Sequence, residues 1–94
     1  MIIMRTHVNI TITGRVQKIG FRYSTQEVAT RLNILGFVQN LPDGSVYIEA
    51  EGAEEDIKTF IIWCHEGPRW AHVDKVEVEK SAMKNFSVFE IKMS

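Results

Sequence analysis

The chain has 94 residues, of which 45% are hydrophobic and 24% are charged. This length predicts one domain over residues 1–94 whose core needs no disulfide or metal to support it, and the composition excludes a disordered chain. The 11 basic and 12 acidic residues leave a net charge of −1. That balance argues against a protein that binds nucleic acid or a membrane surface, because such binding depends mainly on positive charge.

The single cysteine, Cys64, excludes an intramolecular disulfide and indicates a reducing compartment. No run of about 18 apolar residues is present, so no membrane span is predicted. The N-terminal stretch Met1–Arg5 is too short for a secretory signal. We therefore expect a cytoplasmic protein.

Residues 7–13 alternate between apolar and polar side chains, which predicts a half-buried strand with Val8, Ile10 and Ile12 facing inward. Residues 14–22 then form a loop that leads into a helix. Apolar side chains recur at helical spacing from Phe21 to Leu35, and Gly36 is predicted to close this helix as its C′ residue.

Residues 37–41 and 45–51 are predicted to be two strands joined at the turn Pro42-Asp43-Gly44. A second helix is expected to begin near Ala53, with three acidic residues in its first turn, and to stop at Gly67-Pro68. A strand follows over residues 73–79, where the alternation slips phase and predicts a bulge. A last short strand is expected at residues 88–92.

The order β-α-β-β-α-β with a short terminal strand predicts an α+β fold, the ferredoxin-like split βαβ sandwich. We expect an antiparallel sheet of strand order 4-1-3-2 with both helices on one face. In this topology the first two strands end at the same edge of the sheet, so Asn40 arrives near the loop of residues 14–22. Two strand spacings separate them by roughly 10 Å.

That loop presents free backbone N–H groups and the positive end of a helix dipole, and both attract anions. Arg22 lies at the start of the helix, where the dipole disfavours a cation. We interpret the loop as a phosphate cradle. Residues that shape the backbone here include Gly14 and Gly20.

Residues 14–22, with the sequence GRVQKIGFR, resemble the G-x-V-Q-G-V-x-F-R signature of acylphosphatases. Residues 36–46, GFVQNLPDGSV, resemble the second motif of that family, G-x-V-x-N-x-x-D-G-x-V. Gly67-Pro68 with Ala71 and Val73 is similar to the loop after the family's second helix. The resemblance runs from about Val8 to Ile91.

The resemblance implies a hydrolase that converts acyl phosphates to a carboxylate and inorganic phosphate. Arg22 matches the phosphate-binding arginine and Asn40 the asparagine that positions the attacking water. The backbone amides that surround the phosphate match those of Gln17, Lys18, Ile19, Gly20 and Phe21. The leaving carboxylate has a conjugate acid of pKa near 4, so no general acid is needed. We expect no metal and no cofactor.

The family pattern has glycine where this chain has Lys18. If that position requires φ > 0, the side chain costs about 1–2 kcal/mol and can reshape the cradle. Alternatively, the lysine adds a positive charge beside the phosphate. The simpler interpretation of Arg22 is a surface arginine paired with a carboxylate, and that of Asn40 is a cap on the turn at Pro42-Asp43-Gly44.

Two other functions remain as alternatives within the same fold. One is a module that binds phosphate or an acyl phosphate but hydrolyses it poorly, which Lys18 favours. The other is a domain of the larger carbamoyl-transfer proteins that mature hydrogenases. Those proteins continue into cysteine-rich zinc-binding segments, which are not expected here because the sequence stops at Ser94.

An RNA-binding domain of this fold class needs aromatic side chains on its central strands. The glutamates predicted on the outward face here would repel a nucleic-acid backbone, and only one aromatic residue accompanies them. The predicted outward positions are His7, Asn9, Thr11, Thr13, Tyr47, Glu49 and Glu51. The acidic run of Glu49, Glu51, Glu54 and Glu55 is predicted to be a solvated face.

Cys64 is expected to be a buried, inert thiol. The sequence does not decide the oligomeric state, although we expect a monomer.

Overall fold

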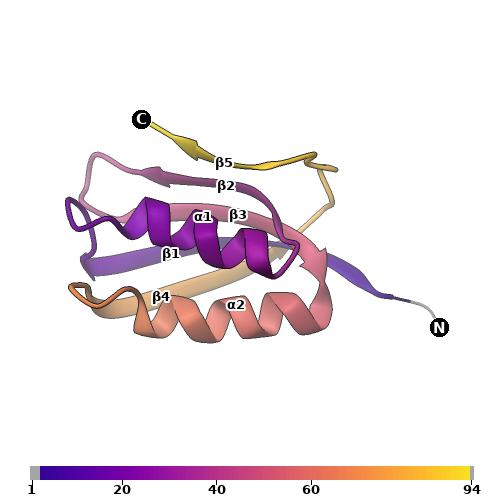
Figure 1. Cartoon of the computed structure of the whole chain (residues 1–94), viewed down its shortest axis with the longest axis horizontal. Helices are drawn as coiled ribbons and strands as arrows, with labels where there is room; N and C mark the ends of the chain where they lie inside the picture. The colour runs from indigo at the N-terminus through magenta and orange to yellow at the C-terminus, as the bar shows by residue number, and fades with distance from the viewer. Residues whose placement is uncertain (1–2, 94) are drawn as a thin grey trace.

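The computed structural model describes residues 3–93 and shows a sheet with two helices on one of its faces (Figure 1). In chain order the elements are β1 (Arg5–Arg15), α1 (Phe21–Arg31), β2 (Leu35–Asn40), β3 (Val46–Ala53), α2 (Glu54–Glu66), β4 (His72–Ser81) and β5 (Phe89–Lys92). The strand order is β4-β1-β3-β2-β5, which confirms the predicted order 4-1-3-2. The terminal strand β5 pairs parallel with β2, so the complete sheet is mixed rather than antiparallel throughout.

The core lies between the sheet and the helices. The inward side chains of β1 are at most 2% exposed and pair with the inward side chains of β3, Ile10 opposite Ile48 and Val8 opposite Ala50. The helices contribute Phe21, Thr25 and Ala29 from α1 and Ile57, Phe60 and Cys64 from α2. The alternation in the strands and the spacing in the helices therefore identify the same core.

The predicted bulge is present between β1 and β4. Thr13 pairs with Lys75 but Gly14 pairs with Val73, so Asp74 is the extra residue in β4. A side chain on Gly14 would place its Cβ 2.2 Å from the carbonyl oxygen of His72. The bulge therefore brings the two backbones into a contact that only glycine permits, immediately before the predicted phosphate loop.

The predicted end of the first helix is wrong. The helix α1 ends at Arg31, and Asn33 takes the left-handed conformation with φ 57°. Leu35 and Gly36 belong to β2, so Gly36 is not the C′ residue of a helix. Asparagine tolerates the left-handed region better than most residues, which allows Asn33 to turn the chain where glycine was expected.

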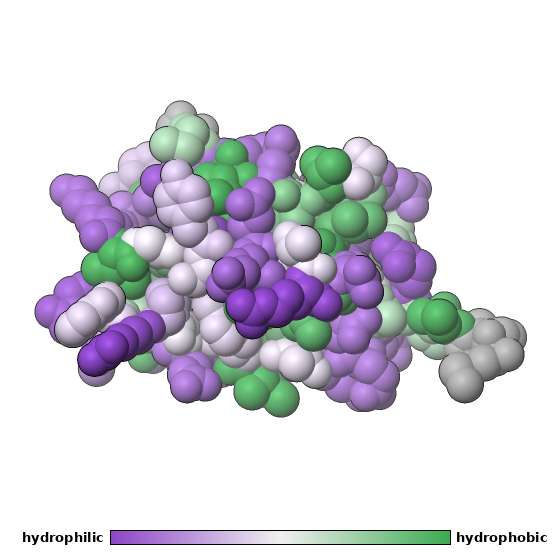
Figure 2. Space-filling view, viewed as in Figure 1, coloured by the Kyte–Doolittle hydropathy of each residue, from purple (hydrophilic) through white to green (hydrophobic). Residues whose placement is uncertain are grey.

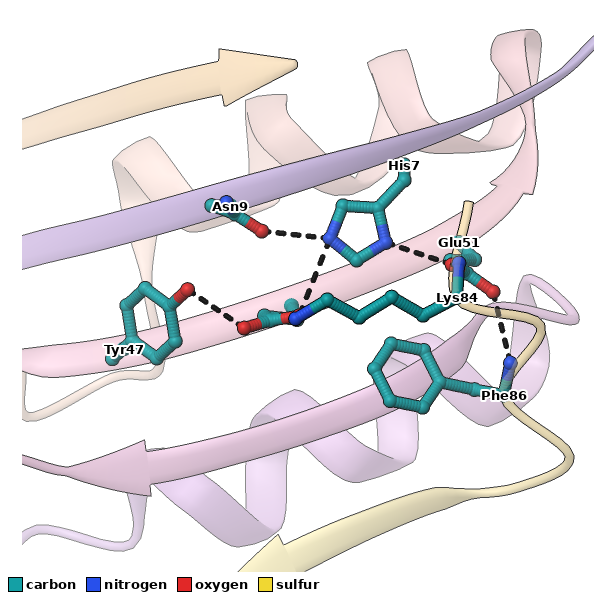
Figure 3. A network of polar contacts seen from close by, with 7 residues as sticks. His7, Asn9, Tyr47, Glu51, Lys84 and Phe86 are labelled. Carbon is teal, nitrogen blue, oxygen red and sulfur yellow. Dashed lines mark hydrogen bonds and ion pairs between the residues drawn. The ribbon is translucent and has the colours of Figure 1, made fainter. Parts of the chain in front are cut away.

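The prediction of a solvated acidic face is wrong for its first two members. Glu49 is 6% exposed and Glu51 is fully buried, because the segment between β4 and β5 covers the face of the sheet that carries no helices. Figure 3 shows His7 pointing from β1 toward Glu51 on β3, with Lys84 and Phe86 of that segment close to them. Lys84 pairs with Glu49 at 2.7 Å, so a cation from a distant part of the chain neutralises the carboxylate.

Hydrophilic residues dominate the helix-bearing face, and its hydrophobic residues are dispersed among them (Figure 2). Ile62 on α2 is an example, and it is 69% exposed. Within residues 3–93, neither helix is long and apolar enough to cross a membrane.

Candidate active site

Strands β1 and β2 both finish at one end of the sheet, beside the loop that enters α1 (Figure 1). A small pocket is lined by residues from this loop, from the first turn of α1 and from the end of β2. Its volume is about 90 Å³. The lining residues are Val16, Lys18, Gly20, Phe21, Arg22, Tyr23 and Asn40. The topology therefore brings the two predicted catalytic residues, which are 18 positions apart in the sequence, into one pocket.

The first turn of α1 faces this pocket with its backbone donors uncapped. Phe21 begins the helix because its side chain is buried and packs against Trp63 of α2, with the ring centroids 5.6 Å apart. Gly20 precedes it at φ 81°, a conformation that glycine adopts without steric cost. No side chain caps this helix end and its first turn contains no acidic residue. The positive end of the dipole is therefore available to an anion.

Arg22 is half-buried, and the C-terminal strand holds its guanidinium. Its Nη1 donates to the carbonyl oxygen of Lys92 at 3.3 Å and lies 3.7 Å from the Sδ of Met93. No carboxylate within residues 3–93 pairs with it, so the interpretation of Arg22 as one half of a surface ion pair gains no support there. A guanidinium has five N–H donors, and these two contacts use one nitrogen.

Asn40, the last residue of β2, has an unsatisfied oxygen. Its side-chain Oδ1 is buried and accepts no hydrogen bond from any described residue. A buried acceptor without a donor costs about 1–3 kcal/mol, so such groups are rare unless a ligand or water uses them. The oxygen belongs to the residue that lines the pocket beside Arg22.

The turn after Asn40 does not use it as a cap. Asp43 takes that role, because its Oδ1 accepts hydrogen bonds from the hydroxyl of Ser45 at 2.6 Å and from its backbone N–H at 2.9 Å. The hydroxyl bond, together with the backbone bond, lowers the pKa of the Asp43 carboxyl below its ordinary value. Asp43 therefore has the capping role that was the simpler interpretation of Asn40.

Two of the predicted loop residues do not line the pocket. Ile19 packs against the core, and the side chain of Gln17 points to the β2–β3 hairpin. Its Nε2 donates to the carbonyl oxygens of Leu41 and Ser45, both at 2.8 Å. Gln17 thus ties the loop to the hairpin that carries Asn40. The sequence motif gave no separate signal for this tether.

The pocket also includes residues that the sequence did not single out. Val16, which is fully buried, and Tyr23, which is 70% exposed, both line it. No periodicity or spacing marks Tyr23, because an aromatic residue in the first turn of a helix is ordinary. Cys64 is buried in the core and does not line this pocket, and burial raises the pKa of its thiol, as expected for an inert cysteine.

All charged side chains among the residues that line the pocket are positive. Its lining contains the two cations Lys18 and Arg22 and no acidic residue. A pocket of this size with two positive side chains, a helix N-terminus and one amide oxygen suits a small anion such as a phosphoryl group.

Comparisons with known proteins identify the family to which the chain is similar. The sequence model of the Acylphosphatase family matches residues 8–91. An acylphosphatase from a Nocardioides species is 42% identical over 89 residues, which cover 95% of this chain and 90% of the relative.

Solved structures give the same result. An acylphosphatase from Coxiella burnetii superposes with a TM-score of 0.91 at 33% identity, covering 94% of this chain and 93% of that one. A structure of full-length HypF superposes equally well, with a TM-score of 0.91 at 32% identity, but this chain spans only 12% of that protein. The match along almost the whole sequence and the shared fold show that the chain belongs to the acylphosphatase family.

Proposed function

We propose that this protein hydrolyses acyl phosphates, the mixed anhydrides of a carboxylic and a phosphoric acid, through the pocket that Arg22 and Asn40 line. The guanidinium of Arg22 and the backbone N–H groups of the loop and first turn would hold the phosphoryl oxygens. The C-terminal strand, through the carbonyl oxygen of Lys92, keeps the guanidinium in place. Phosphoryl transfer depends mainly on such positioning and charge stabilisation.

In the proposed step, water attacks the phosphorus in line with the departing oxygen. The bond between phosphorus and the anhydride oxygen breaks, and its electron pair leaves with the carboxylate. The proton of the water passes to a phosphoryl oxygen, so the products are a carboxylate and inorganic phosphate. Asn40 would orient the water through Oδ1, because an amide oxygen accepts a hydrogen bond from water without removing its proton.

The observation that carries this proposal is the unsatisfied Oδ1 of Asn40 in the same pocket as Arg22. An acceptor for water and a cation for phosphate are the two side-chain functions that the reaction needs. The backbone of Lys18 supports the proposal as well, since its φ of 65° keeps the left-handed conformation that a glycine would take. This conformation is compatible with the glycine of the family pattern, which supports hydrolysis over a module that only binds phosphate.

The test is acyl phosphate hydrolysis without added metal, measured for the wild type, Arg22→Ala and Asn40→Ala. We expect each substitution to lower kcat/KM by about 10²–10³, as removal of one transition-state donor does in other enzymes. Arg31→Ala is the matched control, because Arg31 lies exposed at the other end of α1 and pairs with Glu27. A wild type that binds inorganic phosphate but hydrolyses no faster than Arg22→Ala would show that the protein only binds the anion.

A further inference from the structure

We propose that the side chain of Lys18 is a second phosphate-binding group, which captures the dianionic phosphoryl end of the substrate and acts on KM rather than on kcat. This inference rests on the proposed function for the identity of the anion. It concerns the ammonium group of Lys18, whereas the proposed mechanism uses only the backbone of this residue.

The first observation is the backbone conformation of Lys18. Three residues other than glycine have positive φ within residues 3–93, and the other two, Asn33 and Asn85, are asparagines. Asparagine can stabilise the left-handed region by local hydrogen bonds, whereas lysine has no such compensation. Strained residues of this kind cluster at ligand-binding sites, where the strain is offset by what the side chain does.

The second observation is the absence of an internal partner. Lys18 takes part in none of the ion pairs formed within the described part of the chain, unlike Lys84, which pairs with the buried Glu49. Lys18 is an exposed residue that lines the pocket, and no carboxylate is among the lining residues. A residue in a strained conformation thus carries, on the lining of the pocket, a positive charge that no carboxylate of the described residues neutralises.

The effect of this charge follows from its position. An exposed ammonium near a dianion strengthens binding and association through a screened Coulomb attraction. It changes little during the chemical step, because the total phosphoryl charge is similar in the bound substrate and in the transition state. Lys18 should therefore matter most for substrate capture at low ionic strength, and Arg22 for the reaction itself.

Three variants separate charge from backbone strain. Lys18→Gln removes the charge but keeps a side chain of similar length, Lys18→Arg keeps the charge, and Lys18→Gly removes the charge and relieves the strain. Lys58→Gln is the matched control, because Lys58 is exposed on α2 and its loss changes the net charge equally. The measurements are KM and kcat for an acyl phosphate, direct binding of inorganic phosphate by calorimetry, and the unfolding midpoint, each at low and at high salt.

We expect Lys18→Gln and Lys18→Gly to weaken phosphate binding and raise KM by about fivefold at low salt, with less effect at high salt. Lys18→Arg should bind phosphate as the wild type does, and kcat should change less than twofold, a bound that reflects the small change in charge during the step. Lys18→Gly should also unfold at a higher midpoint than Lys18→Gln, because both variants lack the charge but only glycine relieves the backbone strain. The difference between the two midpoints therefore measures the strain.

Wild-type phosphate affinity and KM in Lys18→Gln at low salt would overturn the inference. The outcome is separable from a failure of the proposed function. If the wild type binds phosphate with the expected dependence on Lys18 but hydrolyses nothing, the proposed function is wrong and the phosphate-binding role of Lys18 stands.

Discussion

Gln17 shows how one side chain can determine the shape of the pocket without lining it. Its amide nitrogen donates to two carbonyl oxygens of the β2–β3 hairpin, those of Leu41 and Ser45. These bonds join the loop that presents the backbone amides to the strand end that presents Asn40. Because the two segments are far apart in the sequence, local structure alone would not fix their separation.

We expect Gln17→Ala to lower the free energy of unfolding by about 1–3 kcal/mol, since two hydrogen bonds are lost and two carbonyl oxygens lose a donor. It should also lower kcat/KM, because the distance between the loop and Asn40 is no longer fixed. Gln39→Ala is the control, as Gln39 lies in β2 next to Asn40 on the opposite face of the sheet. Denaturant unfolding and steady-state kinetics test both variants, and unchanged kinetics in Gln17→Ala would show that the tether serves stability alone.

Cys64 gives a second prediction at the scale of a residue. Because the side chain is fully buried and burial raises the pKa of the thiol, the reactive thiolate is scarce in the folded protein. A thiol reagent should label Cys64 slowly under native conditions and completely in denaturant. The native enzyme should therefore keep its activity during exposure to the reagent. Rapid native labelling accompanied by loss of activity would contradict the assignment of Cys64 as a core residue.

At the scale of elements, the close approach of β2 to β3 depends on Gly36. A Cβ at this position would lie 1.8 Å from the carbonyl oxygen of Glu49, and the backbone has φ 144°. Gly44 in the hairpin turn also has a positive φ, 95°, but a Cβ there would meet no atom within 4 Å. A side chain at Gly36 would therefore introduce both a steric clash and the strain of a positive φ, whereas a side chain at Gly44 would introduce the strain alone.

We expect Gly44→Ala to cost about 1–2 kcal/mol, the penalty of a side chain at positive φ. Gly36→Ala should cost more than about 4 kcal/mol, because the two strands must separate at the start of β2. Urea unfolding of the two variants gives the comparison, with refolding yield as the second readout if Gly36→Ala does not fold. Equal losses in both would indicate that the strands can shift at little cost.

The elements that the sequence predicted well are those whose pattern is local. The alternation in β1 and β3, the acidic first turn of α2 and the slip of phase in β4 each correspond to a feature of the structure. The end of α1 was misplaced because the apolar spacing continues through Leu35, while the turn at Asn33 depends on an asparagine in a conformation more typical of glycine. The parallel pairing of β5 with β2 could not be predicted, since a four-residue strand carries no signal of its partner.

The same distinction holds for the candidate site. The resemblance to the acylphosphatase motifs singled out Arg22 and Asn40, and the expected topology placed the ends of β1 and β2, and with them these two residues, at one edge of the sheet. The tether of Gln17 and the contact of Arg22 with Lys92 were not predicted, because each joins residues that no local pattern relates. The buried state of Glu49 and Glu51 was missed for the same reason, since their cover comes from a segment more than 30 residues away.

For the whole molecule, that covering segment links the open face of the sheet to the active site. Glu51 accepts hydrogen bonds from the backbone N–H groups of Lys84 and Phe86 and lies 2.8 Å from the Nδ1 of His7 (Figure 3). The segment continues into β5, whose Lys92 carbonyl oxygen accepts the hydrogen bond from Arg22. The buried carboxylates thus fasten the strand that positions the guanidinium.

The carboxylates should also set the acid limit of stability. Burial acts to raise the pKa of both glutamates, but the hydrogen bonds that they accept lower it by more. Glu49 accepts hydrogen bonds from Lys84 and Tyr47. Glu51 accepts them from Lys84, His7 and Phe86. The charges of Lys84 and His7 add to this effect at Glu49, and that of His7 at Glu51. Both pKa values therefore lie below the ordinary 4.5. A lowered pKa in the folded state contributes stability that is complete above the unfolded value and is lost as the pH falls through the folded value.

We therefore expect the free energy of unfolding to be steady above pH 5 and to fall progressively below about pH 4.5, the unfolded carboxyl value. Glu51→Gln should lower stability at pH 7 by about 3 kcal/mol, because His7 loses its buried carboxylate partner and the amide cannot accept every bond. The difference between this variant and the wild type should shrink as the pH falls, since protonation removes the same charge from the wild type. Denaturant unfolding from pH 3 to pH 7 measures the stability of both proteins. Glu55→Gln, on the exposed face of α2, is the control. A difference in stability between Glu51→Gln and the wild type that does not change with pH would mean that Glu51 stabilises the segment by packing rather than by its charge.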